Sequence, residues 1–237
     1  MTNYRVERAR DPQDLARRAA ETIAAQIDLA LDQRDRCQIA LSGGSPPASA
    51  YSLLGQERLP WDRVDVVLGD ERWVAAEDES SNAGMLRRTL LAPGPGASAS
   101  FHPVPTVELE SPEASAHAFA EQVSRLCSGV PPVFDVMLLG LGDDGHTASL
   151  FPGTDAPTVV DRWTTIGRGK GLDRITLTAP VLSAARQVIF LVSGAGKQEA
   201  LRRLLDPSES AHRTPARLVQ PASDVLILAD QDAAAGL

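Results

Sequence analysis

The stretch that decides the fold of this chain reads FDVMLLGLGDDGHTASLFP, at residues 134–152. Its apolar run from Val136 to Leu141 predicts a buried strand, and the glycines that follow allow the backbone to turn tightly where the strand ends. His146 comes directly after this turn. Because ligands of an open α/β sheet bind outside the carboxyl ends of its strands, we expect His146 to face a site.

The chemistry of His146 depends on its neighbours. An imidazole has an ordinary pKa of about 6.5 and therefore exchanges protons near neutral pH. Either Asp143 or Asp144 is close enough in sequence to orient the ring or to stabilise its charged form. From these residues alone, a polar side chain that caps a following helix explains His146 equally well.

The same turn matches the dinucleotide-binding pattern GxGxxG at Gly140, Gly142 and Gly145. That pattern works because backbone N–H groups meet a pyrophosphate, and two aspartates inside the turn would place negative charge against it. The acidic residue expected about 20 residues later would be Asp161, which follows a loop rich in Pro and Thr instead of ending a strand. The dinucleotide interpretation is therefore the weaker one.

The length of the chain allows one large α/β domain or two small ones. With 237 residues, of which 43% are hydrophobic, the chain can bury a sizeable core, and no Gly/Ser linker divides it, so we expect a single domain over residues 1–237. Cys37 and Cys127 lie far apart without a CxxC pattern, which disfavours disulfides and structural zinc and fits a reducing cytoplasm.

Charge and hydropathy narrow the possible partners. Residues 1–12 lack the apolar segment of a secretory signal, and no apolar run approaches the roughly 20 residues that span a bilayer. A net charge of −8 repels nucleic acid in general, although it allows a local basic pocket for a small anion. We therefore expect neither a membrane nor a nucleic-acid partner.

Hydrophobic periodicity predicts alternating helices and strands. Asp11 and Pro12 are typical of the cap and first turn of a helix, whose apolar residues then recur at every fourth position up to Leu31. Further helices are expected near 48–54, 81–91 and 113–126, and another follows Lys197 and reaches Leu205. Strands are expected at 38–41, 64–68, 136–141, 175–178, 188–192 and 225–228. Apolar strands separated by helices indicate a parallel sheet covered on both faces. The irregular stretch 92–112 is expected to be a surface loop.

Three more polar segments follow predicted strands and should meet at one edge of the sheet. The first is LSGGSPP at 41–47, where Gly43 and Gly44 allow the backbone to approach a ligand closely. At the start of a helix such a turn is typical of an anion-binding site, although an ordinary strand-to-helix turn also explains it. The second is the loop GDERW at 69–73, where an arginine at a strand end could clamp a carboxylate or phosphate.

The third segment, SGAGK at 193–197, resembles a shortened phosphate loop. It lacks the spacing and the Ser/Thr of a Walker motif. A cation at a helix N-terminus opposes the helix dipole, so the position of Lys197 favours a functional role over a surface lysine.

These motifs together resemble the 6-phosphogluconolactonase family. The resemblance is carried by LSGGSPP at 41–47, GDERW at 69–73 with Ser-Asn at 81–82, GLGDDGHTASLFP at 140–152, RITLT at 174–178 and SGAGK at 193–197. It spans most of the chain. It implies an α/β, modified doubly wound (Rossmann-like) fold with a mostly parallel sheet, shared with sugar-phosphate isomerases.

The resemblance also implies an activity, the hydrolysis of 6-phosphoglucono-δ-lactone to 6-phosphogluconate in the oxidative pentose phosphate pathway. With the turn chemistry, it suggests His146 as general base and Asp144 as the carboxylate that orients it. The residues expected to bind the substrate or its phosphate are Gly43, Gly44, Ser45, Asp70, Arg72, Arg174 and Lys197. We expect no cofactor and no metal, and a small phosphorylated sugar lactone as the partner; a monomer is favoured, although sequence does not determine oligomeric state.

Two alternatives remain within this fold. Glucosamine-6-phosphate deaminases have a similar Asp-Gly-His turn, but they carry an acid where Phe151 stands and an aromatic residue where Arg72 stands. A non-catalytic sugar-phosphate-binding module of a transcription regulator usually has an attached DNA-binding helix pair, and nothing before the first predicted strand is long or basic enough for one.

Overall fold

The computed structural model describes residues 2–237 and contains a central sheet of seven parallel strands. The strand order across the sheet is β1-β10-β9-β6-β2-β3-β5. The strands are β1 (Tyr4–Ala9), β2 (Cys37–Leu41), β3 (Val64–Leu68), β5 (Ser100–Phe101), β6 (Val136–Gly140), β9 (Gln187–Val192) and β10 (Val225–Asp230).

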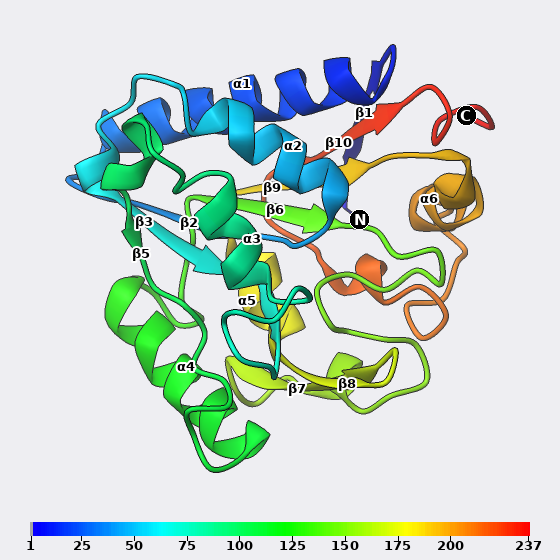
Figure 1. Ribbon diagram of the computed structural model, residues 1–237. Coiled ribbons are helices and arrows are strands. Elements are labelled where there is room, and N and C mark those ends of the chain that lie inside the picture. The colour runs from blue at the N-terminus through cyan, green and yellow to red at the C-terminus, as the bar shows by residue number, and fades with distance from the viewer. Residues whose placement is uncertain (1) are drawn as a thin grey trace.

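Helices cover both faces of this sheet. In Figure 1, α1 and α2 lie across one face, whereas α4 and α5 lie toward the other. The helices are α1 (Pro12–Leu31), α2 (Ser45–Leu54), α3 (Asn82–Arg88), α4 (Pro112–Leu126), α5 (Ala179–Ala184) and α6 (Gln198–Leu205). Ile39, Val66, Leu138, Phe190 and Ile227 on the inner strands are fully buried, as expected for strands covered on both faces.

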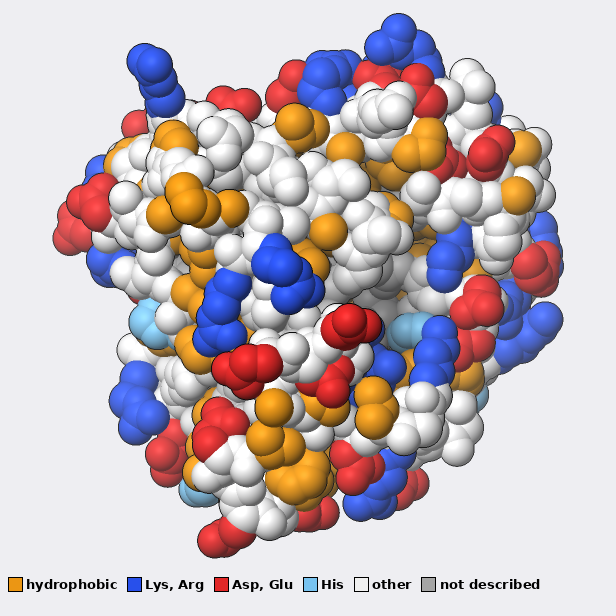
Figure 2. Space-filling view, in the orientation of Figure 1, with side chains coloured by type: hydrophobic (Ala, Val, Ile, Leu, Met, Phe, Trp, Pro, Cys, Tyr) orange, Lys and Arg blue, Asp and Glu red, His pale blue; other side chains and the backbone are white. Residues whose placement is uncertain are grey.

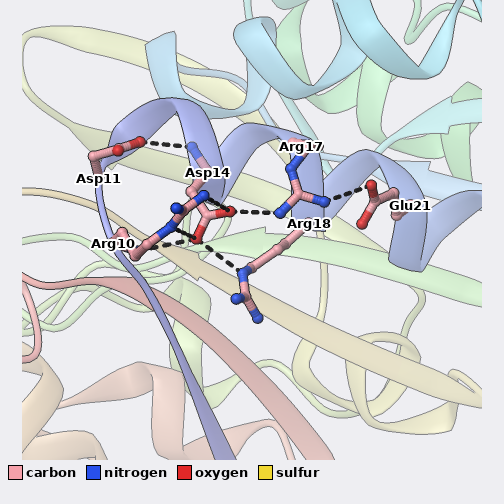
Figure 3. Close-up of polar contacts among 6 residues, drawn as sticks. All are labelled: Arg10, Asp11, Asp14, Arg17, Arg18 and Glu21. Atoms are coloured by element: carbon pink, nitrogen blue, oxygen red, sulfur yellow. Dashed lines mark hydrogen bonds and ion pairs between the residues drawn. The ribbon is translucent and has the colours of Figure 1, made fainter.

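The start of α1 forms as its sequence predicts. Asp11 is the N-cap, and its carboxylate accepts the backbone N–H of Asp14 at 2.7 Å. Asp14 then accepts hydrogen bonds from the backbone of Arg10 and from the guanidinium groups of Arg17, at 2.6 Å, and Arg18, at 3.1 Å (Figure 3). These bonds lower the pKa of Asp14 and keep a negative charge in the first turn, where the helix dipole favours it.

A second, antiparallel sheet was not predicted. It contains β4 (Asp70–Arg72), β8 (Leu172–Leu177) and β7 (Thr164–Gly169) in the order β4-β8-β7. Two expectations are therefore wrong: residues 70–72 are a strand, not a loop, and the strand predicted at 175–178 lies outside the parallel sheet. The reason is that β4 follows β3 after Gly69 and pairs with β8, a partner more than 100 residues away that local periodicity does not reveal.

The ends of the parallel sheet also differ from expectation. Residues 4–9 form the edge strand β1 beside β10. From the sequence, residues 1–12 are considered only as a possible secretory signal, and Met1 of that segment lies outside the described residues. The stretch 92–112 contains the two-residue edge strand β5. In residues 2–237, no helix is both long enough and apolar enough to cross a membrane.

The strand order creates a crevice between β2 and β6. From β2 the chain winds outward through β3 to β5, then returns to β6 on the other side of β2 and continues to β9 and β10. Loops that leave β2 and β6 therefore turn in opposite directions. Open α/β sheets bind ligands outside the carboxyl ends of the strands at such a switch point.

Candidate active site

His146 lies in the turn that leaves β6, and Asp144 holds it there. One carboxylate oxygen, Oδ1 of Asp144, accepts the backbone N–H of His146 at 3.0 Å and is 2.5 Å from the ring Nδ1. An ionised carboxylate only accepts hydrogen bonds, so Nδ1 carries the proton and Nε2 is the free, basic nitrogen. Asp144, not Asp143, is therefore the carboxylate that contacts the imidazole.

The electrostatics of this pair favour a neutral imidazole beside an ionised aspartate. Burial lowers the pKa of His146, and this outweighs the opposing effect of Asp144. Burial alone would raise the pKa of Asp144, but its hydrogen bonds with the His146 backbone and ring bring it below the usual value. The side chain of His146 is 15% exposed, so the ring remains accessible from one side.

Glycines make room for this arrangement. A Cβ at Gly142 would lie 2.0 Å from Nδ1 of His146 and 2.6 Å from Oδ1 of Asp144. Gly145 has φ +92°, and its carbonyl accepts the backbone N–H of Ala216 at 3.0 Å. The glycines that resemble a dinucleotide fingerprint thus shape the histidine turn, and no helix follows it directly.

Phe151 forms one wall beside His146. Its ring centroid is 4.5 Å from that of the imidazole, and the guanidinium carbon of Arg174 lies 5.4 Å from the Phe151 centroid. The aromatic ring excludes water from one side of the histidine and contributes to its burial. It also holds the Arg174 side chain through a cation–π contact.

The second sheet brings two arginines together at the site. Arg72 in β4 pairs directly with Arg174 in β8, and the Nε atoms of both are buried with no hydrogen-bond partner among residues 2–237. Arg174 is 3.8 Å from the carboxylate of Asp70, which also accepts the hydroxyl of Ser149. Burial lowers the pKa of Arg174; Asp70 opposes this effect and Arg72 adds to it.

Glu71, the residue between Asp70 and Arg72, fastens β4 to α3. Its buried carboxylate accepts the backbone N–H groups of Arg72, Asn82 and Ala83 at 2.7 to 2.8 Å. Burial raises the pKa of Glu71 in spite of these bonds. Ser81 is the N-cap of α3, and its hydroxyl oxygen accepts the N–H of Gly84 at 3.0 Å.

The loop after β2 presents backbone to the site. Gly44 has φ +112° and is the N-cap of α2, whose first turn contains Pro46 and Pro47. A Cβ at Gly43 would lie 1.9 Å from Oδ1 of Asn82, so only glycine lets these two segments approach so closely. Pro46 and Pro47 have no N–H, so the donors that this turn can offer to the site are the backbone N–H groups of Gly43, Gly44 and Ser45.

Asp230, at the end of β10, organises the loop after β9. Its carboxylate accepts the hydroxyl of Ser193 at 2.5 Å and the N–H of Gly194 at 3.0 Å. Lys197 follows in a short turn of 3-10 helix, Ala195–Lys197, immediately before α6.

These segments enclose a cavity of about 210 Å³ at the carboxyl ends of the strands. In Figure 2 the surface is hollowed on this face, and a histidine, cationic and acidic side chains border the hollow. Of the predicted site residues, those that line the cavity are Gly43, Gly44, Asp70, Arg72, His146, Arg174 and Lys197. Ser45 and Asp144 are not among the described residues that line it; Ser45 is exposed in the first turn of α2, and Asp144 reaches the site through His146.

Sequence reasoning missed Lys170 and the lining roles of Asn82 and Ser193. Asn82 was noted only as part of the Ser-Asn pair at 81–82, and Ser193 was quoted only as the first residue of its loop. Lys170 lies in the turn Gly169-Lys170-Gly171 between β7 and β8, whose pairing was not predicted. The two flanking glycines are the sequence signal that could have identified this turn. In the described part of the chain, no group of three or more His, Cys, Asp or Glu side chains is placed to hold a metal ion.

Comparison with known proteins identifies the family. A family model described as "Glucosamine-6-phosphate isomerases/6-phosphogluconolactonase" matches residues 10–228. The chain belongs to this family. A curated relative from Synechocystis sp., named 6-phosphogluconolactonase, is 41% identical over 228 residues, which cover 95% of each chain. A relative of the same name from Nostoc sp. is 40% identical over 235 residues, or 98% of each chain.

Solved structures of the family share the fold. A structure of 6-phosphogluconolactonase from Trypanosoma brucei superposes on the whole of both chains with a TM-score of 0.88 at 29% identity. The family resemblance and the fold class predicted from the sequence are therefore confirmed. Because the family's description covers both isomerases and lactonases, the chemistry must be argued from the site.

Proposed function

We propose that this family member hydrolyses 6-phosphoglucono-1,5-lactone to 6-phosphogluconate, as in the oxidative pentose phosphate pathway. It is a carboxylic ester hydrolase. The observation that carries the proposal is the His146–Asp144 pair beside a cavity that also contains Arg72, Arg174 and Lys197. A base next to several cations suits a substrate that has both an electrophilic carbonyl and a phosphate. The lactonase name of both relatives near 40% identity supports the same assignment.

His146 acts as the general base in this mechanism. Its free Nε2 takes a proton from the water that attacks the lactone carbonyl carbon, and Asp144 stabilises the imidazolium that forms. The imidazolium then returns the proton to the ring oxygen as the carbon–oxygen bond of the ring breaks. Because the pKa of His146 is lowered, the base is unprotonated at neutral pH and ready to react.

The cations of the cavity bind the phosphate. Two guanidinium groups directly opposite each other on paired strands repel. The carboxylate of Asp70 lies 3.8 Å from Arg174, and Arg72 donates to the carbonyl of Ser80, but the Nε atoms of both arginines have no hydrogen-bond partner in residues 2–237. An anion that accepts hydrogen bonds from both would relieve this repulsion. Lys197 supplies a further positive charge, and the backbone of Gly43 and Gly44 at the start of α2 supplies N–H donors.

Phe151 argues against a deaminase. A glucosamine-6-phosphate deaminase has an acidic side chain at this position to help open and isomerise the sugar ring, whereas Phe151 offers no group that transfers a proton. Lactone hydrolysis requires only activated water and stabilised charge. The packing of Phe151 against His146 therefore fits a lactonase better.

The test is a direct assay with freshly prepared 6-phosphogluconolactone beside glucosamine 6-phosphate, with and without EDTA, and with spontaneous hydrolysis subtracted. We expect activity on the lactone alone, insensitive to the chelator. His146→Ala should lower kcat by about 100- to 10,000-fold, the usual contribution of a general base. His117→Ala, which removes a histidine whose side chain is 80% exposed on α4, is the matched control and should leave kcat unchanged. A folded His146→Ala protein with the wild-type rate would refute the mechanism.

The setting of the enzyme is also part of the proposal. Cys37 and Cys127 are both buried and not in a disulfide, which suits a reducing compartment such as the cytoplasm. We propose that a monomer is sufficient for activity, because one chain brings the base His146 and the cations Arg72, Arg174 and Lys197 to the same cavity.

A further inference from the structure

Lys170 occupies an unusual backbone position at the edge of the cavity. It is the first of two turn residues between β7 and β8, and it has φ +55°, followed by Gly171 with φ +81°. Hairpin turns with two left-handed residues prefer Asn, Asp or Gly at the first position. Glycine has no Cβ to crowd the backbone there, and the short polar side chains of Asn and Asp offset the crowding with local hydrogen bonds. A strained residue that persists in a turn indicates that its side chain is required.

The contacts of Lys170 within the protein do not account for this strain. Its ammonium lies 3.8 Å from a carboxylate oxygen of Asp143, and the two side chains are 56% and 68% exposed. An ion pair this open contributes little to stability because water screens it. Lys170 instead lines the same cavity as His146, and its positive charge acts to lower the pKa of both His146 and Asp144.

The reaction needs a group of this kind near His146. When water adds to the lactone carbonyl, negative charge develops on the carbonyl oxygen, and enzymes stabilise such charge with donors or cations already in place. The backbone N–H groups of Gly142, Gly145 and His146 are already donated within the turn, to His146, Gly142 and Asp144 respectively. Arg174 lies against Phe151 and Asp70, and it is assigned to the phosphate instead. Lys170 is the cation that neighbours the base and has no firm partner in residues 2–237.

We propose that the ammonium of Lys170 stabilises the oxyanion that forms on the lactone carbonyl oxygen. This inference rests on the proposed lactonase activity. Nε2 of His146 takes one proton from water while the hydroxyl oxygen bonds to the carbonyl carbon, and the electron pair of the C=O bond moves to the oxygen facing Lys170. The pair then returns, the bond to the ring oxygen breaks, and the imidazolium protonates that oxygen. The product acid ionises, and its carboxylate meets the same ammonium.

The test compares Lys170→Asn, Lys170→Gly and Lys170→Arg with wild type on 6-phosphogluconolactone. Asn and Gly suit the left-handed turn, so these variants remove the charge without straining the hairpin, and their melting temperature should stay level or rise. We expect both to lower kcat by about a hundredfold, as loss of one oxyanion donor does, with KM little changed. Lys170→Arg should retain most of kcat because it keeps the charge.

Two further measurements separate this role from others. Arg168→Gln removes a charge from the same hairpin outside the residues that line the cavity, and it should behave as wild type. The inhibition constant of inorganic phosphate should be unchanged in Lys170→Asn but raised in Lys197→Ala, because only the latter residue binds phosphate.

The outcomes are distinct. If Lys170→Asn and Lys170→Gly keep the wild-type kcat, or change only KM or the phosphate inhibition constant, Lys170 is not the oxyanion stabiliser although the lactonase assignment stands. If wild type itself does not hydrolyse the lactone, the proposed function fails and this inference fails with it.

Discussion

Gly142→Ala is the substitution that tests the geometry of the site most directly. The added Cβ would lie 2.0 Å from Nδ1 of His146, whereas ordinary contacts begin near 3.4 Å, so the ring must retreat by about 1.4 Å. The φ angle of Gly142 is not in the left-handed region, so alanine is compatible with the backbone itself. The substitution therefore perturbs the imidazole and Asp144 with little direct effect on the chain path.

The magnitude follows from the size of this displacement. Moving a catalytic group by about 1 Å costs on the order of 100-fold in rate, because the reacting atoms no longer meet in the productive geometry. The crowding should also lower the free energy of unfolding by about 1 to 3 kcal/mol, as overpacked sites do. We expect kcat for the lactone to fall by about two orders of magnitude, with KM nearly unchanged because the phosphate contacts lie elsewhere.

The assay is steady-state lactone hydrolysis with the spontaneous rate subtracted, together with urea unfolding of each variant. Gly69→Ala is the matched control: Gly69 is also a buried glycine at a strand end, but the nearest atom to its added Cβ would be 3.8 Å away. It should retain the wild-type kcat. A Gly142→Ala enzyme with kcat within about twofold of wild type would refute the reasoning that this glycine confines the ring.

Two other predictions concern charge. When kcat/KM is measured against pH, the midpoint of its fall on the acid side should lie below the ordinary histidine pKa of about 6.5. Burial lowers the pKa of His146, so the proposed base becomes protonated only when the pH falls through that lowered value. In Asp144→Asn the midpoint should move lower still, since the carboxylate opposes the effect of burial; a midpoint above that of wild type would contradict this assignment. Asp230→Asn should raise KM several-fold and leave kcat nearly unchanged, because the carboxylate orders Ser193 and Gly194 ahead of Lys197, the lysine proposed to bind phosphate. Kinetics that show a loss of kcat alone would place that loop nearer the reacting carbonyl.

The elements that could be predicted are those that local patterns determine. The apolar run before Gly140 forms β6 with a boundary one residue away, and the Asp-Pro pair starts α1 where it was expected. The glycine turns and the polar residues after each parallel strand could also be found. The carboxyl ends of parallel strands lie at one edge of a sheet, so the order of elements alone brought His146, Gly43 and Lys197 to one cavity.

The choice between neighbouring residues of like chemistry could not be made from the sequence. Asp143 and Asp144 are adjacent carboxylates, and only the turn geometry directs Asp144 to His146 while Asp143 faces Lys170. A turn of this kind depends on the φ and ψ angles of several residues and on contacts with Ala216, which belongs to a distant segment.

The sequence by itself therefore determined the layered α/β architecture, the edge of the sheet that carries the candidate site and the histidine that lies in it. Hydrophobic periodicity and the residues that form turns are local properties, so they can be recognised in a single sequence. Only the tertiary structure decided that β4 pairs with β8, which sets Arg72 opposite Arg174 and brings the Lys170 turn to the cavity. Strand pairing across more than 100 residues depends on which edges remain free once the whole chain has packed.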